Sequence, residues 1–522
     1  MKLKLIVIAC SLLAACFTHA QKHDYNYYTT GSVDPRNYGV HFQYVDSLND
    51  IVLDTFNIDG RISFSPVMSD QEGVFLFYFN SMHIYDSLGR TAINGDSMYH
   101  GSYLEQRYGL FPPSRGLGVG NDVQFIPVSD SLYFMFSLAK EQPGSPNYNV
   151  DIQEKGFRLN GYSEGLWFTA IRLTQDGRVK ILESEKKLNL LDQQIGLEQL
   201  ISIKKENGED WWMMVPELLT DSIFLFSIDV SEEALVYEGK RYFSPFNARV
   251  CAGEFIGIHP KGEYIVRLFN QQVEELNHII EIFAFDRCTG QTDRLFVDSL
   301  PIGDISDSPS GDVEFSENGR FLYVALSEYI LQYDMMDDNP LENRDTIGYI
   351  IIEGDRRLST NMDQLWRLPN GKILSCGIVS TSYAHYIHNP NEKGDACNFE
   401  NKALIMPTDP LFPQGNLLLT TLPTYPPYRM PPLDYDCETS VDESEYQSDV
   451  FVSLYPNPAW IETTVQIHGA EIRRARMLDI NGQQVLKTEG HGRFDVSTLP
   501  GGVYFVEVET QRGVFVRKLV IR

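Results

Sequence analysis

The chain has 522 residues, enough for about three domains of ordinary size. It carries 71 acidic and 43 basic side chains, a formal net charge of −28, and this excess of negative charge argues against binding to nucleic acid. Hydrophobic residues make up 43% of the sequence and aromatic residues 12%, which excludes a chain that is disordered throughout.

Residues 1–20 have the features of a secretory signal peptide. Two lysines precede an apolar stretch, and a small-residue site predicts cleavage between Ala20 and Gln21. The apolar stretch is too short to cross a bilayer as a helix. Cys16 ends a sequence that is similar to a lipobox, in which it would become the lipidated first residue, and this alternative stays open. No other stretch has the length of a transmembrane helix, so we expect no transmembrane segment.

Most of the chain alternates short runs of β-branched and aromatic residues with turn signals, which predicts an all-β fold. An internal repeat joins two apolar strands through a polar turn that contains glycine. Such turns at Gly208, Gly262, Gly319 and Gly371 lie 54, 57 and 52 residues apart. Four strands with their loops fill such a period, and strands that are apolar on both faces must pack between neighbours. We predict a β-propeller over residues 21–423 with seven blades; six or eight blades, or a pair of β-sandwiches, are the alternatives.

The end of the chain has a different composition. Residues 424–449 are first rich in proline and then acidic, which is typical of an extended, solvated linker. Residues 450–522 contain several short strands and predict a small antiparallel, immunoglobulin-like β-sandwich.

Five cysteines lie beyond the signal segment, and no two of them have the CxxC spacing of a structural zinc site. Two disulfides and one free thiol are the simplest arrangement for an exported protein. Proximity in the sequence suggests the pairs Cys251–Cys288 and Cys376–Cys397, although spacing alone does not fix the connectivity.

Several short motifs could carry chemistry, and for each the structural interpretation is stronger. Ser163 lies in a GxSxG motif, but a strand is predicted to follow it where a nucleophile elbow needs a helix. The glycine-rich residues 116–120 lack a P-loop lysine. Residues 334–339 could offer oxygen ligands to a structural calcium, although a solvated acidic turn is the favoured interpretation. Trp211 and Trp212 are expected in the core. We therefore assign no catalytic residue, no cofactor and no metal ligand.

The C-terminal unit carries a YPNP start, an NGQ turn, an LPxGxY segment and a basic, apolar end. The motif residues are Tyr455, Pro456, Asn457, Pro458, Gly482, Gly501, Gly502, Tyr504 and Lys518. This combination resembles the C-terminal sorting domain of the type IX secretion (Por) system of Bacteroidetes. The resemblance implies export from the cytoplasm, handling by the type IX machinery and passage across the outer membrane. Removal of the domain, with attachment to the cell surface or release, would follow.

The repeat region resembles secreted β-propeller proteins of the same bacteria. The likeness covers roughly residues 55–400 and is clearest at residues 73–85, 210–215 and 389–398. It supports the fold far more than any activity.

Seven Asp-Ser or Asp-Thr pairs precede an apolar residue, as in the O-glycosylation motif of exported Bacteroidetes proteins. The hydroxyl residues are Ser47, Ser87, Ser97, Ser131, Ser222, Ser299 and Thr346. Asp-Ser is also ordinary turn chemistry, so both interpretations stay open.

Together these features predict an exported β-propeller at the cell surface or in the medium that binds an extracellular glycan or protein as a binding or adhesion module. An extracellular enzyme that acts on polysaccharide is the first alternative, because dispersed carboxylates in a propeller can form such a site. A structural component of the cell-surface apparatus is the second.

Overall fold

The fold is taken from a computed structural model of the chain, and no α-helix occurs in the residues that it describes. The described residues are 21–29, 38–57, 67–80, 83–95, 98, 123–138, 166–188, 200–216, 222–242, 250–272, 276–301, 311–326, 328–337, 339–349, 362–377, 381–410, 414–419, 422–434, 437, 451–455, 457, 459–468, 471–479, 483–488, 492–511 and 513–521.

Within these residues, the first 26 strands form seven separate antiparallel sheets whose strands are hydrogen-bonded in chain order. Two sheets have three strands each: β1 (Asn26–Thr29), β2 (Tyr38–Val45) and β3 (Asp50–Asn57); β4 (Val67–Ser69), β5 (Phe75–Phe79) and β6 (Ile84–Asp86). Five sheets have four strands each: β7 (Val123–Pro127), β8 (Leu132–Leu138), β9 (Leu166–Leu173) and β10 (Val179–Leu188); β11 (Ile201–Lys204), β12 (Trp211–Pro216), β13 (Ser222–Asp229) and β14 (Ala234–Tyr242); β15 (Val250–Ile258), β16 (Tyr264–Gln272), β17 (Leu276–Asp286) and β18 (Gln291–Pro301); β19 (Asp312–Phe315), β20 (Phe321–Leu326), β21 (Tyr329–Asp334) and β22 (Arg344–Tyr349); β23 (Gln364–Arg367), β24 (Ile373–Cys376), β25 (Tyr383–Ile387) and β26 (Phe399–Ile405), with a 3-10 turn η2 (Gly394–Cys397) before β26.

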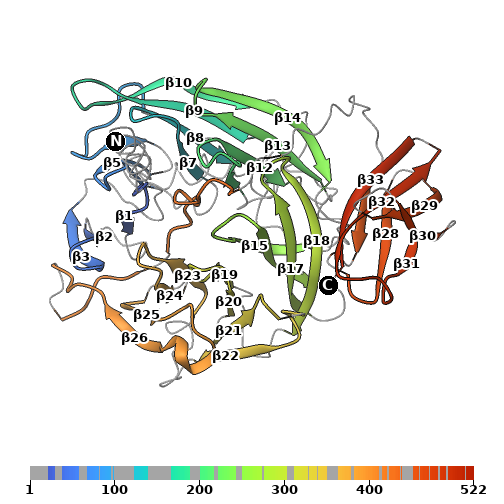
Figure 1. The fold of residues 1–522 in the computed structure, drawn as a ribbon. Coiled ribbons are helices and arrows are strands. Elements are labelled where there is room, and N and C mark those ends of the chain that lie inside the picture. The colour runs from blue at the N-terminus through green and yellow to red at the C-terminus, as the bar shows by residue number, and fades with distance from the viewer. Residues whose placement is uncertain are drawn as a thin grey trace, which may run out of the picture.

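The sheets follow one another around a ring, which confirms the predicted all-β propeller (Figure 1). The repeat turns that the sequence predicts are present: Gly208, Gly262, Gly319 and Gly371 have φ values of 72°, 71°, 75° and 83°. A side chain is strained at such angles, so glycine suits these turns. The number of blades stays a prediction, because the first two sheets have only three described strands each.

Neighbouring sheets pack face to face, as strands that are apolar on both sides require. One buried cluster joins Leu268 and Ile280 of one sheet to Phe315 and Leu322 of the next. The first strands β15, β19 and β23 of three successive sheets lie side by side. The centre of the ring is therefore lined by the first strand of each of these sheets.

The first and last sheets meet and close the ring. Lys372 Nζ lies 2.6 Å from Asp50 Oδ2, and the Tyr386 hydroxyl donates to Asp50 Oδ1 at 3.0 Å. The rings of Phe42 and Trp366 pack edge to face in the same contact. Side-chain packing thus joins the first and last sheets, and among the described strands none is shared between them.

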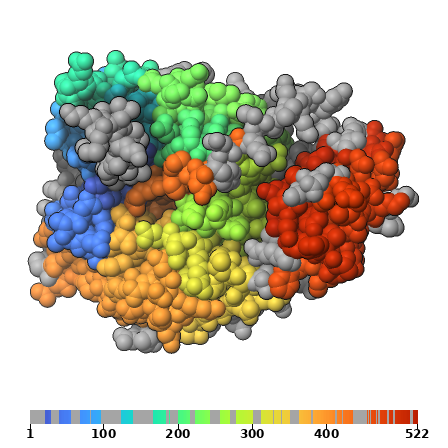
Figure 2. All heavy atoms as spheres, in the orientation of Figure 1, coloured from blue at the N-terminus to red at the C-terminus, as the bar shows by residue number. Residues whose placement is uncertain are grey.

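The proline-rich residues after the last sheet do not form a solvated linker. We call residues 422–434 the strap, and it crosses the centre of the ring (Figure 1; Figure 2 shows its orange atoms between blue, green and yellow ones). Tyr428 and Met430 are only 2% and 3% exposed. The prediction of a solvated linker is wrong for residues 424–434, because the strap places Tyr428 and Met430 in the apolar interior of the ring. Apart from Cys437, the rest of the predicted linker (residues 424–449) lies outside the described residues.

The predicted disulfides are also wrong. Cys288, in the turn between β17 and β18, is bonded to Cys437, which is 149 residues away in the sequence and follows the strap. Cys376 and Cys397 are free and buried in different hydrophobic clusters, so packing keeps them apart. Cys251 lies in β15, and its side chain is outside the described part.

The C-terminal unit is the small antiparallel sandwich that the sequence predicts. One sheet contains β27 (Phe451–Tyr455), β28 (Glu462–His468) and β31 (Arg493–Asp495); the other contains β30 (Gln484–Thr488), β29 (Ile472–Leu478), β32 (Gly502–Thr510) and β33 (Gly513–Ile521). The two sheets share one buried core, and β27 lies against β18 of the propeller. Among the described residues, no helix is long and apolar enough to cross a membrane.

Candidate functional site

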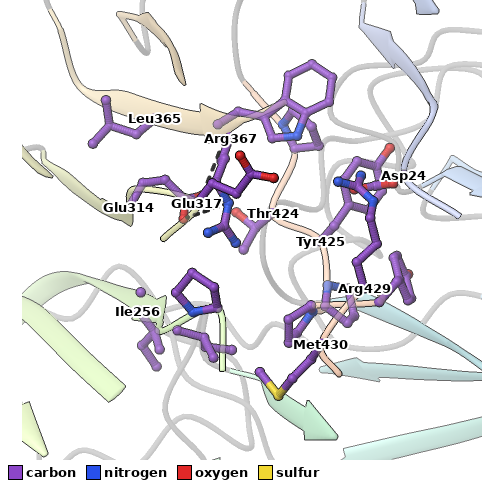
Figure 3. Close-up of a pocket in the computed structure, with 18 of the residues that line it drawn as sticks. Asp24, Ile256, Glu314, Glu317, Leu365, Arg367, Thr424, Tyr425, Arg429 and Met430 are labelled. Carbon is purple, nitrogen blue, oxygen red and sulfur yellow. Dashed lines mark hydrogen bonds and ion pairs between the residues drawn. The ribbon is translucent and has the colours of Figure 1, made fainter. Parts of the chain in front are cut away.

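A pocket of about 370 Å³ lies at the centre of the ring. Its walls come from β15, β19, β23 and the strap (Figure 3). Aromatic and proline side chains supply much of the wall. The charged lining residues are Asp24, Lys261, Asp312, Glu314, Glu317, Arg367 and Arg429.

Two carboxylates on β19 link this strand to its neighbour β23. Asp312 Oδ2 accepts the backbone N–H of Leu365 at 2.9 Å, and Glu314 Oε2 accepts that of Arg367 at 3.3 Å. Residues two apart on a strand project to the same side, so both carboxyl groups face β23. These hydrogen bonds hold the carboxyl groups in fixed positions beside the pocket.

Burial changes the protonation of both groups. Burial, together with the nearby charge of Glu314, raises the pKa of Asp312 to about 8, against the opposing effect of its backbone hydrogen bonds. Burial also raises the pKa of Glu314, whereas the Arg367 guanidinium opposes this rise. At pH 7 most Asp312 carboxyl groups therefore carry a proton.

Arg367 brings a positive charge to the same wall. Its Nε lies 3.9 Å from Glu314 Oε1, and its Nη1 donates to the carbonyls of Phe315 and Ser316 at 3.5 and 3.3 Å. Figure 3 shows the guanidinium beside the glutamate. The carbonyls and the carboxylate hold this side chain against the wall.

A second ion pair lies on the opposite wall, where the N-terminal residues meet the strap (Figure 3). The Arg429 guanidinium donates to Asp24 Oδ2 and lies 5.9 Å from the centre of the Tyr25 ring. Asp24 Oδ1 is buried and has no hydrogen-bond partner among the described residues. One oxygen of this carboxylate is thus held by Arg429 and the other is enclosed by the protein.

Gln21, the residue predicted to follow signal cleavage, is held against the ring. Its Oε1 accepts from Lys204 Nζ at 2.5 Å, and the same amine donates to the Gly208 carbonyl at 2.8 Å. Burial lowers the pKa of Lys204 to about 7. Ala20 and Cys16 lie outside the described residues, so the cleavage site stays a prediction.

The sorting motif has a structural role within the sandwich. Asn457 donates to the Lys518 carbonyl and accepts the Val520 N–H, both at 2.8 Å, and so binds the terminal strand. The Tyr504 hydroxyl donates to the Pro500 carbonyl at 2.9 Å. Gly501 and Gly502 stand at the start of β32. For Tyr455 the structure describes the backbone alone, and Pro456, Pro458 and Gly482 are outside it.

The other predicted positions are dispersed over the surface or lie outside the described part. Of the hydroxyl residues in the glycosylation motif, four are exposed: Ser47, Ser87, Ser299 and Thr346. Ser131 and Ser222 are half-buried. Ser97, Ser163 and residues 116–120 are outside the description. Glycosylation stays a prediction; within the described part of the chain, the four exposed hydroxyls are the most accessible positions.

The acidic turn after β21 offers little to a calcium ion. Arg320 donates to both oxygens of Asp334, at 3.0 and 2.8 Å, and Lys393 Nζ lies 3.7 Å away. In the described part of the chain, no three His, Cys, Asp or Glu side chains gather where they could hold a metal ion. Cations of the protein itself thus contact Asp334, while Asp338 lies outside the described residues, and the calcium alternative stays a prediction.

The pocket residues were not singled out in the sequence. Asp312 and Glu314 are two of 71 acidic residues, although they alternate with Val313 and Phe315 in the strand before the turn at Gly319. The sequence feature that could have indicated these pocket residues is the alternation of polar and apolar residues in the first strand of a blade, because that strand faces the central channel.

Comparison with known proteins identifies the C-terminal unit. Residues 453–522 match the family described as the secretion system C-terminal sorting domain. This unit is therefore a sorting domain, and the chain is a substrate of type IX secretion. It is delivered to the cell surface or the extracellular space, and its tail is cleaved. The predicted handling by the type IX machinery is confirmed.

No curated protein matches the sequence significantly. Among solved structures, a protein from Lactobacillus plantarum is 10% identical with a TM-score of 0.41, covering 72% of this chain and 95% of that one. A putative 6-phosphogluconolactonase from Bacteroides uniformis is 13% identical with a TM-score of 0.33, covering 60% and 78%. An oligogalacturonate lyase in complex with manganese is 12% identical with a TM-score of 0.31, covering 69% and 86%. Similarities this distant give no basis for assigning an activity.

Proposed function

We propose that this exported β-propeller is a binding module whose ligand occupies the central pocket. The observation that carries the proposal is the convergence of fixed polar groups on one pocket from three adjacent sheets and the strap. Polar groups already held in place cost little ordering free energy when a ligand binds. The volume of about 370 Å³ is near the lower end for small-molecule sites, so it suits a small molecule or the end of a larger chain.

The hydrogen bonds of β19 favour binding over hydrolysis. Asp312 and Glu314 each accept a backbone N–H from β23, and these contacts maintain the packing of the two strands. A general base needs a free lone pair directed at the proton it removes. Carboxyl groups that are fixed by backbone hydrogen bonds serve more readily as immobile polar contacts for a ligand.

The test is a binding screen with the full chain from residue 21. The protein is applied to arrays of polysaccharides and extracellular matrix proteins, and each hit is titrated by calorimetry. We compare wild type with Lys261→Met and Glu317→Gln, which change charges in the pocket lining. Glu342→Gln, on an outer surface cavity, is the matched control.

We expect saturable binding of at least one ligand, with a Kd that rises about tenfold in a pocket variant and stays unchanged in the control. The reason is that a hydrogen bond to a charged group contributes about 1.5–3 kcal/mol to binding. A hit that is insensitive to both pocket variants places the ligand elsewhere. A complete absence of saturable binding contradicts the proposal.

A polysaccharide-acting enzyme is the second candidate, and the protonation of Asp312 favours it. A carboxyl group that stays protonated at pH 7 beside a second carboxyl group matches the acid of a glycoside hydrolase. Release of reducing sugar by wild type, and its loss in Asp312→Asn with the fold intact, would replace the binding proposal by this one.

A further inference from the structure

We infer that the strap is a permanent wall of the central pocket and that the Cys288–Cys437 disulfide keeps it there after the sorting domain is removed. The inference rests on the proposed function where it concerns the ligand. The part that concerns the strap itself can be tested without any ligand.

The strap is bound to four different sheets. The Leu422 N–H donates to Gln364 Oε1 at 2.8 Å in the last sheet, and the Tyr425 hydroxyl donates to the Asn26 carbonyl at 2.6 Å in the first. Further hydrogen bonds run from the Tyr428 hydroxyl to the Phe125 carbonyl at 2.9 Å and from the Leu433 N–H to the Glu206 carbonyl at 2.8 Å. A segment that bonds to sheets all around the ring is part of the propeller.

The strap runs close to the backbone of two repeat turns, at Gly208 and Gly262. A Cβ atom on Gly208 would lie 2.7 Å from the Pro432 nitrogen, and one on Gly262 would lie 2.9 Å from the Met430 sulfur. Both glycines have positive φ, so each position needs glycine for the backbone as well as for the contact. The ring and the strap therefore fit each other closely.

The strap also holds the N-terminal residues in place. The Tyr428 ring packs edge to face on His23 at 5.2 Å, next to the ion pair between Arg429 and Asp24. Displacement of the strap would leave the half-buried Asp24 carboxylate without the cation that it contacts here. Asp24, near the first described residues, and the strap thus form one wall of the pocket together.

The position of the Cys288–Cys437 disulfide relative to the sorting domain determines whether the strap stays attached after that domain is cleaved off. Cys437 follows the strap directly, and the match to the sorting domain begins at residue 453. A cut between residues 437 and 453 leaves the disulfide intact. The strap then remains attached at its start through the main chain and at its end through Cys288.

Hydrogen exchange on the exported, tail-free protein tests this inference. Peptides that cover residues 422–434 are followed with and without a phosphine reductant, and peptides from β19 and β20 serve as an internal reference. The Cys288→Ser/Cys437→Ser double variant is the matched control, because it lacks the bond that the reductant breaks. The mass of the exported protein reports whether the strap is still present.

We expect a mature chain that extends past Cys437, with slow exchange in the strap. Reduction should speed that exchange about tenfold in wild type and leave the reference strands unchanged, since a cross-link suppresses local opening. The double variant should exchange fast with or without reductant. The inference is overturned if the mature chain ends before residue 422. It is also overturned if the hydrogen-exchange rate of the strap is the same with and without the reductant.

The outcome also separates the two proposals. A protected strap in a protein that binds nothing on the arrays leaves the wall established and refutes the binding function. A ligand whose affinity is the same in oxidised, reduced and double-variant protein refutes the role of the strap in the pocket and leaves the binding function standing.

Discussion

Replacing Tyr428 by phenylalanine should remove one anchor of the strap and little else. The hydroxyl donates to the Phe125 carbonyl at 2.9 Å, while the ring packs on His23 and on Trp211 at 5.2 and 6.0 Å. Phenylalanine keeps both ring contacts, so the change removes only the hydrogen bond. A buried carbonyl that loses its donor costs about 1–3 kcal/mol, and we expect the free energy of unfolding to fall by about 1–2 kcal/mol.

Guanidinium denaturation followed by tryptophan fluorescence measures this change, because Trp211 lies next to the substituted ring. Tyr428→Ala, which also removes the ring, should cost about 3–5 kcal/mol. Tyr349→Phe is the control, since Tyr349 is 65% exposed. The reasoning is refuted if Tyr428→Phe stays within about 0.5 kcal/mol of wild type, the range of an ordinary surface substitution.

Three further changes test other parts of the structure. Gly208→Ala should destabilise the propeller by about 2 kcal/mol in thermal unfolding, and by more than Gly177→Ala. Both turns have positive φ, but only at Gly208 does Pro432 lie within 4 Å of the added Cβ. Equal losses of stability in the two variants would show that the strap does not constrain the turn at Gly208. Stability should fall as pH drops from about 6.5 to about 4, because burial lowers to about 4 the pKa of four folded-state histidines, so that the unfolded chain binds more protons in this window. The four are His41, His259, His278 and His385. The carboxyl groups whose pKa burial raises, such as Asp312, act in the opposite direction but are fewer among the described residues. The midpoint of urea unfolding at each pH measures the effect, and a flat profile contradicts it. Deletion of residues 450–522 should retain the protein in the periplasm, as cell fractionation would show, and normal surface delivery would exclude a sorting role for this domain.

The features that local physics determines could be predicted from the sequence. Turns at Gly262, Gly319 and Gly371 need positive φ, and apolar strands on both sides of each turn need neighbours to cover them. The repeat therefore indicates a ring of sheets. The asparagine of the YPNP motif is similar: Asn457 binds the backbone of the terminal strand, so its place in the motif follows from a local hydrogen-bond pattern.

What the sequence could not show depends on the path of the chain in space. A stretch of prolines and tyrosines has the same composition whether it is solvated or crosses the centre of a ring. The strap is buried because the chain leaves the last sheet at a point from which it runs across the centre of the ring. Cys288 and Cys437 are 149 residues apart, so proximity in the sequence favoured the wrong partners. The pocket carboxylates Asp312 and Glu314 became recognisable once β19 was placed beside β23.

The disulfide also changes how a pulling force travels through this protein. The shortest covalent path between the two ends of the chain runs from the N-terminus to Cys288, across to Cys437 and on to the tail. Residues 289–436, which include the strap and the last two sheets, lie off that path. Tension applied to the tail during transport would pass into the turn between β17 and β18. The parts of the pocket wall that come from β19, β23 and the strap thus lie off the path of this tension, whereas β15 and Asp24 lie on it.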